Sequence, residues 1–218
     1  MNRPRICASI IKGDLDDIKR VAPLVDLYEV RIDLIGSDWR EVVRHLGKPW
    51  IACNRKPSEG GNWRGGEKER IAELLSTLEL GVAIVDVELS TENLSEVVTQ
   101  IKKRAECLIS HHDVEKTPSL DTMKEMVQKQ LAAGADIAKV VTTARKFEDS
   151  VSTLRLIQEF PRARIVSFAM GPLGLVSRLL CPLVGGEFTY ASMAPGREAA
   201  SGQITADALR QIYGMVKR

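Results

Sequence analysis

The stretch Gly134-Ala135-Asp136-Ile137-Ala138-Lys139-Val140-Val141 shows how this chain is built. A glycine turn leads into a short apolar run, which is typical of a strand buried on both faces. Seven similar runs occur along the chain, alternating with stretches whose apolar residues have helical spacing. The expected strands are residues 5–10, 27–33, 50–55, 84–89, 107–112, 137–142, 164–170 and 188–192, and the expected helices are residues 14–25, 39–46, 67–80, 92–104, 120–133, 147–160, 173–180 and 205–216.

Eight strand–helix alternations within 218 residues predict an α/β fold, a (β/α)8 TIM barrel that forms one domain over residues 1–218. The main rival is an open, doubly wound sheet. No GxGxxG motif or P-loop follows the first expected strand. Polar residues also stand at the ends of many strands, as they do around a barrel mouth, whereas an open sheet concentrates them at one switch point. Both observations favour the barrel.

Composition excludes several classes of protein. The net charge of +2 gives no strong field for nucleic acid or an anionic membrane, so neither is expected as a partner. No apolar run approaches the length of about 18 residues that a membrane helix needs, and the first residues lack the apolar core of a signal peptide. Three histidines and four scattered cysteines without a CxxC pair predict a cytoplasmic protein with reduced thiols and no metal site. The cysteines are Cys7, Cys53, Cys107 and Cys181.

Lys139 is the residue that points to chemistry. An unpaired ammonium among Ile, Ala and Val is costly to bury, but proton loss removes that cost and leaves a nucleophile for carbonyl groups. The segment Ser110-His111-His112-Asp113 ends the preceding expected strand, and alternation predicts that His112 faces inward with Ser110. A strand lysine beside a strand-end histidine indicates an imine-forming lyase or aldolase. The structural alternative for Lys139 is a buried ion pair with Glu88.

Other charged residues are expected around the same mouth. In residues 27–33, Glu29, Arg31 and Asp33 share one face, which should point into the barrel. Arg55 ends the third strand and is suited to hold a carboxylate through two hydrogen bonds; the alternative is a surface ion pair with Glu59.

The fourth strand carries Asp86 and Glu88 on one face, as counter-ions for arginine or Lys139. The glycine-rich loop 60–66 follows a strand and is expected to act as a lid. Arg178 lies in a helix that follows a strand–turn segment and is expected to reach an anionic group over the mouth.

Several segments, in order along nearly the whole chain, carry a family resemblance. They are Glu29-Val30-Arg31-Ile32-Asp33, Arg55-Lys56-Pro57-Ser58-Glu59-Gly60-Gly61, Asp86-Val87-Glu88-Leu89, Ser110-His111-His112-Asp113, Lys116-Thr117-Pro118, Ala135-Asp136-Ile137-Ala138-Lys139, Met170-Gly171 and Ser177-Arg178. With these segments the chain resembles the type I 3-dehydroquinate dehydratases of the shikimate pathway of aromatic amino acid biosynthesis.

The resemblance implies a (β/α)8 barrel, often a homodimer, that eliminates water from 3-dehydroquinate to give 3-dehydroshikimate without a metal or organic cofactor. It implies that Lys139 forms a Schiff base with the C3 ketone, that His112 donates and accepts protons, and that Glu59 sets the protonation of His112. The residues that the resemblance assigns to substrate binding are Glu29, Arg31, Arg55, Arg178 and, on the first strand, Ser9.

The last loop departs from the family pattern Ser-Ala-Pro-Gly-Gln, in which the serine and glutamine contact substrate. Met193-Ala194-Pro195-Gly196-Arg197 keeps Pro-Gly but replaces both functional residues. Ala199-Ala200-Ser201-Gly202-Gln203 keeps Gly-Gln before a helix, so we favour Gln203 as the substrate ligand. Ala199 then stands at the serine position, and Ser201 replaces that serine only if the loop is rebuilt.

Two other functions compete with the dehydratase. A class I Schiff-base aldolase of sugar phosphates on the same barrel would need a glycine-rich phosphate loop late in the chain, and residues 170–174 and 183–186 are the candidates. A barrel that binds ligand without catalysis is the other alternative. The presence of Lys139, His112 and Glu59 together favours an enzyme.

Overall fold

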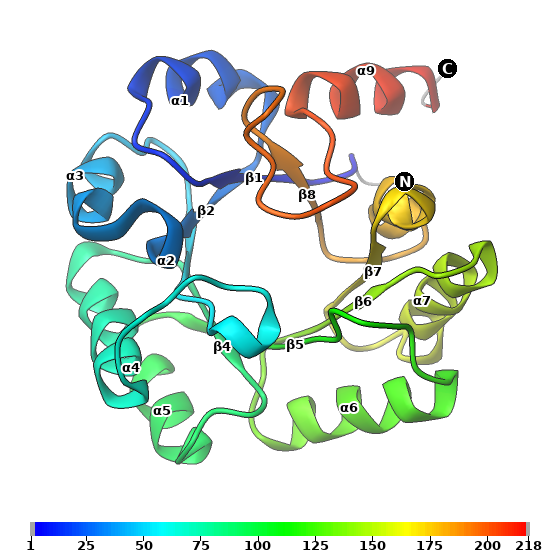
Figure 1. The fold of residues 1–218 in the computed structure, drawn as a ribbon, viewed down its shortest axis with the longest axis horizontal. Helices are drawn as coiled ribbons and strands as arrows, with labels where there is room; N and C mark the ends of the chain where they lie inside the picture. The colour runs from blue at the N-terminus through cyan, green and yellow to red at the C-terminus, as the bar shows by residue number, and fades with distance from the viewer. Residues whose placement is uncertain (1–2, 217–218) are drawn as a thin grey trace.

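Eight parallel strands form the centre of the molecule in the computed structural model, which describes residues 3–216. Their order is β7-β6-β5-β4-β3-β2-β1-β8, so neighbours in sequence are neighbours in space, and β8 returns to β1. Figure 1 shows the strands as a ring with the helices outside it. The strands are β1 Ile6–Ile10, β2 Leu27–Arg31, β3 Trp50–Cys53, β4 Ile84–Glu88, β5 Glu106–His112, β6 Ile137–Thr143, β7 Ile165–Met170 and β8 Thr189–Ser192.

The helices fill the connections between strands, as the periodicity predicts. Pro23 lies inside the expected helix 14–25 and divides it into an α-helix and a short 3-10 helix, because proline cannot donate a backbone hydrogen bond. The α-helices are α1 Leu15–Val21, α2 Ile32–Ile35, α3 Trp39–Arg44, α4 Glu67–Ser76, α5 Leu94–Ile101, α6 Leu120–Ala132, α7 Phe147–Glu159, α8 Leu175–Leu180 and α9 Ala206–Val216. The 3-10 helices are η1 Ala22–Leu24, η2 Gly36–Asp38, η3 Pro57–Glu59, η4 Thr77–Leu80, η5 Pro172–Gly174 and η6 Cys181–Leu183.

Alternation along each strand separates the apolar core from the barrel interior. On β6, Ala138 and Val140 are completely buried in an apolar cluster that also contains Met123 and Val127 of α6. Lys139 points the other way, into the barrel. The TIM barrel prediction is therefore confirmed, and the two ends of the predicted domain, residues 1–2 and 217–218, lie outside the described residues.

Two strands end two residues earlier than expected, and β4 ends one residue earlier, at Glu88. β2 ends at Arg31 because the chain turns into the short helix α2, so Asp33 is not a strand residue as predicted. β3 ends at Cys53, and Arg55 lies in the following turn, where its backbone oxygen accepts a hydrogen bond from Trp63. Gly61 packs so closely on that oxygen that a Cβ would lie 1.9 Å from it, which explains a glycine at this turn.

Residues 183–186 lie at the wrong end of the barrel for the sugar-phosphate alternative. They precede β8, so they are at the amino ends of the strands, next to Arg5 and Glu187. TIM-barrel active sites lie at the carboxyl ends of the strands. The phosphate-loop interpretation of this segment is therefore wrong.

The side chains of β7 and β8 close the ring between these two strands. Within residues 3–216 no ladder joins β7 to β8, although the Glu187 amide bonds to the Ile165 carbonyl at 2.8 Å. Phe168 of β7 and Tyr190 of β8 bridge the seam edge-on, with ring centres 5.9 Å apart. Tyr190 is thereby fixed on the inner surface of the barrel.

The four cysteines are all described, buried and free, as the sequence predicts. No helix within residues 3–216 combines the length and apolar character needed to cross a bilayer.

Candidate active site

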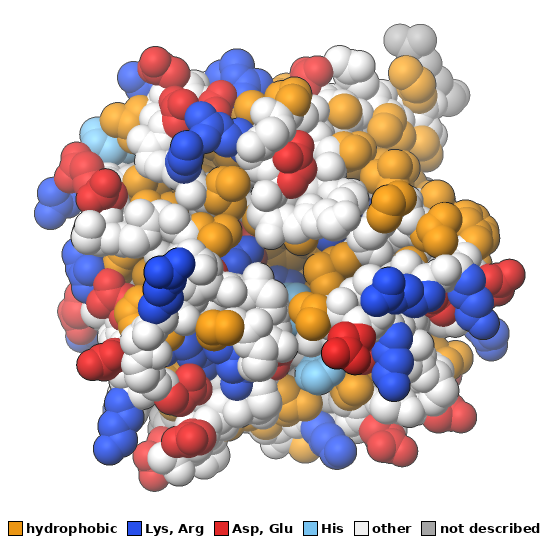
Figure 2. Space-filling view, viewed as in Figure 1, with side chains coloured by type: hydrophobic (Ala, Val, Ile, Leu, Met, Phe, Trp, Pro, Cys, Tyr) orange, Lys and Arg blue, Asp and Glu red, His pale blue; other side chains and the backbone are white. Residues whose placement is uncertain are grey.

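A cavity that is partly open to solvent lies at the carboxyl ends of the strands. Figure 2 shows it as a hollow near the centre of one face, with Lys, Arg and His side chains visible inside. The lining residues are Glu29, Arg31, Cys53, Arg55, Glu59, Gly60, His112, Lys139, Val141, Phe168, Met170, Arg178, Tyr190, Ala199, Ala200 and Gln203.

Lys139 lies at the bottom of this cavity and is only 3% exposed. Its Nζ lies 2.9 Å from Asp86 Oδ2 and 3.7 Å from Glu29 Oε1, and it donates to the Tyr190 hydroxyl at 3.0 Å. Carboxylates therefore offset the cost of burial, and the partners are Asp86 and Glu29 instead of Glu88, which the ion-pair alternative named.

Asp86 joins Lys139 to a second buried cation. Arg55 donates to Asp86 Oδ2 at 2.7 Å, and Ser110 donates to Asp86 Oδ1 at 2.6 Å. Burial alone would raise the pKa of Asp86, but Arg55 and Lys139 hold the pKa below its ordinary value, so the carboxylate stays ionised. The alternative of a surface pair between Arg55 and Glu59 is wrong, because Arg55 is buried and pairs with Asp86 and Glu88.

A fully buried arginine that the sequence analysis missed supports Glu88 from behind. Arg70 of α4 donates to Glu88 Oε2 at 2.6 Å and pairs with Glu67 at 2.8 Å. Glu88 thus joins Arg70 to Arg55, whose Nη1 lies 2.9 Å from Glu88 Oε1. The helical pattern of residues 67–80 places Arg70 on α4 but gives no sign that its side chain crosses beneath the barrel mouth.

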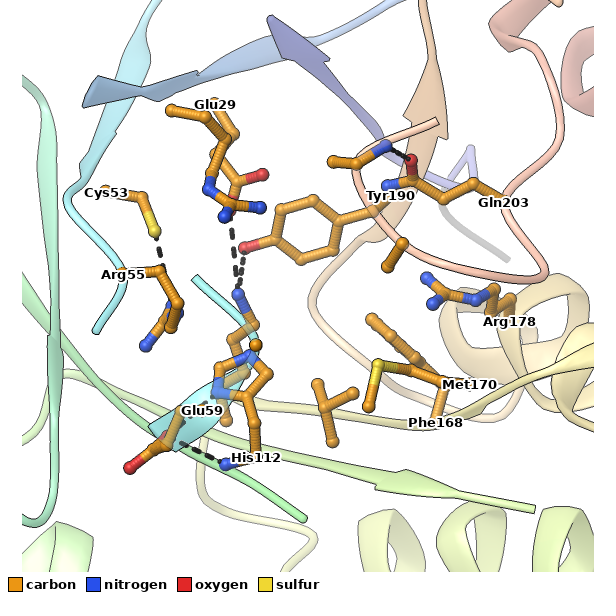
Figure 3. Close-up of a pocket in the computed structure, with 16 residues that line it drawn as sticks. Glu29, Cys53, Arg55, Glu59, His112, Phe168, Met170, Arg178, Tyr190 and Gln203 are labelled. Atoms are coloured by element: carbon orange, nitrogen blue, oxygen red, sulfur yellow. Dashed lines mark hydrogen bonds and ion pairs between the residues drawn. The ribbon is translucent and has the colours of Figure 1, made fainter. Parts of the chain in front are cut away.

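His112 and Glu59 face each other at one side of the cavity (Figure 3). Glu59 Oε2 accepts from the His112 backbone amide at 2.9 Å and lies 3.1 Å from Nδ1, while Oε1 accepts from Ser90 at 2.9 Å. Burial and the positive charges of Arg55 and Lys139 lower the pKa of His112 well below its ordinary value. Burial raises the pKa of Glu59, against the opposing effect of Arg55. The imidazole is therefore neutral, oriented and available as a base near pH 7.

Arg178 and Gln203 face the cavity from the opposite side (Figure 3). Arg178 is 3% exposed, and its Nε has no hydrogen-bond partner within residues 3–216. Its one hydrogen bond there is to the Ser201 backbone oxygen at 3.3 Å, and it stacks on Phe168 with 4.4 Å between Cζ and the ring centre. Burial lowers the pKa of Arg178 to about 10, against the opposing effect of Glu29. A buried guanidinium without a carboxylate partner in the described chain is prepared for an anion from outside.

The last loop adopts the register that places Gln203 in the cavity. Ala199 and Ala200 line the cavity with it, whereas Ser201 is exposed. Gln203 Oε1 accepts from the Ala199 amide at 2.7 Å, which fixes the side-chain amide. The loop therefore presents alanine, not serine, to the cavity beside Gln203.

Arg31 lines the cavity, whereas Ser9 lies behind the residues that line it. Ser9 is fully buried and is absent from the residues of 3–216 that line the cavity; it donates to Glu29 at 2.8 Å and accepts from Gln203 at 3.3 Å. Arg31 lines the cavity and is held by two hydrogen bonds to Asp33, at 2.9 and 2.7 Å. Eight of the nine predicted site residues thus line one cavity, and Ser9 contacts two of them from behind.

Tyr190 is the lining residue with clear chemistry that the sequence analysis missed. Alternation along residues 188–192 puts Phe188, Tyr190 and Ser192 on one face, which was the available signal. Its closeness to Lys139 depends on the return of β8 to β1 and was not predictable from that pattern.

The donor atoms of Glu29, Cys53 and Asp86 lie within 4.8 Å of one another and form the one cluster of metal-ligating type within residues 3–216. Lys139 already contacts both carboxylates of this cluster. Burial raises the pKa of the Cys53 thiol, so the thiolate that a metal requires is disfavoured. The donor set is therefore a poor fit for a metal ion.

Known proteins match this chain over nearly its whole length. The model of the type I 3-dehydroquinase family matches residues 6–218. A 3-dehydroquinate dehydratase of Dehalococcoides mccartyi strain BAV1 is 41% identical over 216 residues, which cover 99% of this chain and 97% of that protein. One of Methanocaldococcus jannaschii is 32% identical over 97% of this chain and 98% of that protein.

A solved structure shows the same fold. The crystal structure of 3-dehydroquinate dehydratase from Geobacillus kaustophilus HTA426 superposes with a TM-score of 0.90 at 26% identity, covering 99% of this chain and 92% of that one. Fold, cavity and sequence relatives agree, and this chain belongs to the type I 3-dehydroquinase family of hydro-lyases.

Proposed function

We propose that this chain eliminates water from 3-dehydroquinate to give 3-dehydroshikimate through a Schiff base on Lys139, as a step of the shikimate pathway. The observation that carries the proposal is one cavity that holds a strand lysine, a neutral histidine oriented by a carboxylate, and a buried arginine without a carboxylate partner within residues 3–216. These three groups suit a substrate that has a ketone, an acidic proton beside it and a carboxylate.

Arg178 is the group proposed to bind the substrate carboxylate. It lies across the cavity from the His112–Glu59 pair, so a ring held by its carboxylate extends toward Lys139 and His112 (Figure 3). Gln203, Arg31, Glu29 and Arg55 supply polar atoms for the hydroxyl groups. We propose that Ser9 acts indirectly, by orienting Glu29 and Gln203.

The chemistry begins when Lys139 gives up a proton and attacks the C3 ketone. The resulting iminium withdraws electrons from C2 and acidifies its proton. The neutral His112 imidazole takes that proton, and the imidazolium then protonates the departing C1 hydroxyl. Glu59 stabilises the imidazolium because its carboxylate lies 3.1 Å from Nδ1. One base that serves both positions gives a syn elimination.

Reductive trapping tests this function. The protein is mixed with 3-dehydroquinate and sodium borohydride, and the masses of the intact chain and its peptides are measured. We expect a stable adduct on the Lys139 peptide that is absent in Lys139→Ala and unchanged in Lys103→Ala, a surface lysine control. A folded protein that forms no adduct would favour the aldolase or the non-catalytic barrel, and turnover of sugar phosphates would separate those two.

The pH dependence of kcat/KM should reveal the unusual protonation of His112. Burial and nearby cations lower the pKa of His112. Its imidazole therefore stays neutral at pH values somewhat below 6.5, where an ordinary histidine would already be largely protonated. We therefore expect kcat/KM to be level down to about pH 6.5 and to fall only at lower pH, when the imidazole gains a proton. In Glu59→Gln the fall should move to still lower pH, because the variant lacks the charge that stabilises imidazolium. A fall that begins above pH 7 would contradict this assignment.

We also propose that the protein is a cytoplasmic homodimer. Phe147 and Val151 of α7 are 53% and 45% exposed, and Leu173 of η5 and Leu180 of α8 are 45% and 37% exposed. Apolar side chains of this region are gathered at the right-hand edge of Figure 2. An exposed apolar patch of this kind is typical of a subunit interface.

Light scattering should give twice the 24.1 kDa mass of the chain, and Phe147→Glu should give the single-chain mass because the patch then carries a charge. A monomeric wild type would refute the dimer, while Lys103→Ala serves as the surface control.

A further inference from the structure

The Tyr190 hydroxyl contacts Lys139 directly, and the mechanism above leaves it unused. It lies 3.0 Å from Nζ and is buried with the rest of the side chain, which is 3% exposed. Nζ also lies 4.3 Å from the centre of the Tyr190 ring. The hydroxyl is therefore in direct contact with the nitrogen that forms the imine.

This hydroxyl is fixed in place, and its own proton is unused. Phe188 and Phe168 hold the ring edge-on, with ring centres 5.5 and 5.9 Å from that of Tyr190. The hydroxyl accepts from Lys139 and donates to no acceptor among residues 3–216. A rigid donor facing a small-molecule cavity with its hydrogen free is suited to bind substrate oxygen.

We propose that the Tyr190 hydroxyl is a catalytic hydrogen-bond donor to the C3 oxygen of the substrate while Lys139 forms the imine and while that imine is hydrolysed. This inference rests on the proposed function. When Lys139 attacks C3, the ketone oxygen becomes a carbinolamine oxygen two bonds from Nζ. A donor in contact with Nζ is then within reach of that oxygen.

The atoms balance without a proton from Tyr190. The nitrogen lone pair forms the C–N bond, and the carbonyl π electrons move to oxygen. The Lys139 ammonium starts with three protons; His112 relays two of them to the oxygen, the C–O bond breaks, and water leaves. One proton stays on the iminium nitrogen, whose lone pair forms the C=N bond. Burial raises the pKa of the Tyr190 phenol well above its ordinary value, so Tyr190 keeps its proton and stabilises the oxygen by hydrogen bonding alone.

Tyr190→Phe is a clean test because it removes only this hydroxyl. The ring, its edge-on contacts and its position over Lys139 are retained, so the fold should persist. The matched control is Tyr28→Phe, which removes another buried hydroxyl, one that donates to the Ile18 carbonyl at 3.2 Å outside the cavity. Thermal unfolding of both variants confirms that they are folded.

The experiment is a single turnover of 3-dehydroquinate with enzyme in excess, quenched with borohydride at successive times and read by intact mass. Total adduct reports imine formation. The trapped 3-dehydroquinate and 3-dehydroshikimate adducts differ by one water, so their ratio reports elimination separately.

In Tyr190→Phe we expect total adduct to form about 10- to 100-fold more slowly, because an oxygen that gains charge loses one donor. The loss of water from the adduct should keep its wild-type rate, and Tyr28→Phe should match wild type in both steps. Adduct formation at the wild-type rate, or equal slowing of both steps, would overturn the role of Tyr190. Absence of adduct in the wild type would instead overturn the proposed function.

Discussion

Lys139→Ala is expected to lower kcat by about 10⁴-fold or more, because removal of a covalent nucleophile leaves only binding and polarisation by the remaining groups. The fold should persist. Asp86 keeps its hydrogen bonds from Arg55 and Ser110, so the carboxylate is not left unpaired. Steady-state kinetics with 3-dehydroquinate measures the loss.

Binding separates a chemical defect from a structural one in this variant. Lys139→Ala should still be stabilised against thermal unfolding by 3-dehydroshikimate, since Arg178 and Gln203 remain in the cavity. Lys103→Ala is the control and should match wild type. A Lys139→Ala protein with more than about one hundredth of wild-type kcat would contradict the imine mechanism, because general acid–base catalysis alone supplies about 10²- to 10⁴-fold.

Arg178→Met is expected to impair substrate binding and to stabilise the protein. Loss of a buried, charge-assisted contact with the substrate carboxylate costs about 3–4 kcal/mol, which corresponds to a rise in KM of about 10²- to 10³-fold. The same change removes a buried guanidinium that has no carboxylate partner within residues 3–216. The free energy of unfolding should therefore increase by about 1–2 kcal/mol. Kinetics and chemical denaturation measure the two effects.

Arg70→Met is the matched control for the stability effect. Arg70 is equally buried but pairs with Glu67 and Glu88. Without Arg70, the one cation within residues 3–216 that still pairs with Glu88 is Arg55. We therefore expect Arg70→Met to destabilise the protein by about 3–5 kcal/mol. If Arg178→Met were as destabilising as Arg70→Met, Arg178 would be a structural residue, not an anion site.

The sequence predicted the barrel well because the signals are local. Each strand and each helix shows its period within a few residues, and eight alternations leave few architectures that bury every apolar face. The errors fall at strand ends. The chain leaves β2 after Arg31 and β3 after Cys53, where tertiary contacts of Asp33 with Asn62 and of Gly61 with Arg55 decide the path.

The sequence also predicted which residues gather at the mouth, because the carboxyl ends of parallel strands meet there. It named Asp86 and Glu88 as counter-ions for arginine or Lys139, and Asp86 pairs with both Arg55 and Lys139. The alternative pairs of Lys139 with Glu88 and of Arg55 with Glu59 were wrong, and the approach of Glu29 to Lys139 was not predicted. Each ion pair depends on the stagger between the strands and on which carboxylate oxygen lies within reach of each lysine or arginine side chain.

By itself, then, the sequence determined the alternation that folds into a barrel and the inward face that carries Lys139 and His112. Only the tertiary structure decided that Asp86 and Glu29 are the carboxylates beside Lys139, that Arg178 is left for an anion, and that Tyr190 contacts Nζ. The physical reason is how far apart along the chain the interacting residues lie. Periodicity is set by neighbours along the chain, whereas a hydrogen bond of about 3 Å between strands far apart in sequence exists only once the barrel has closed.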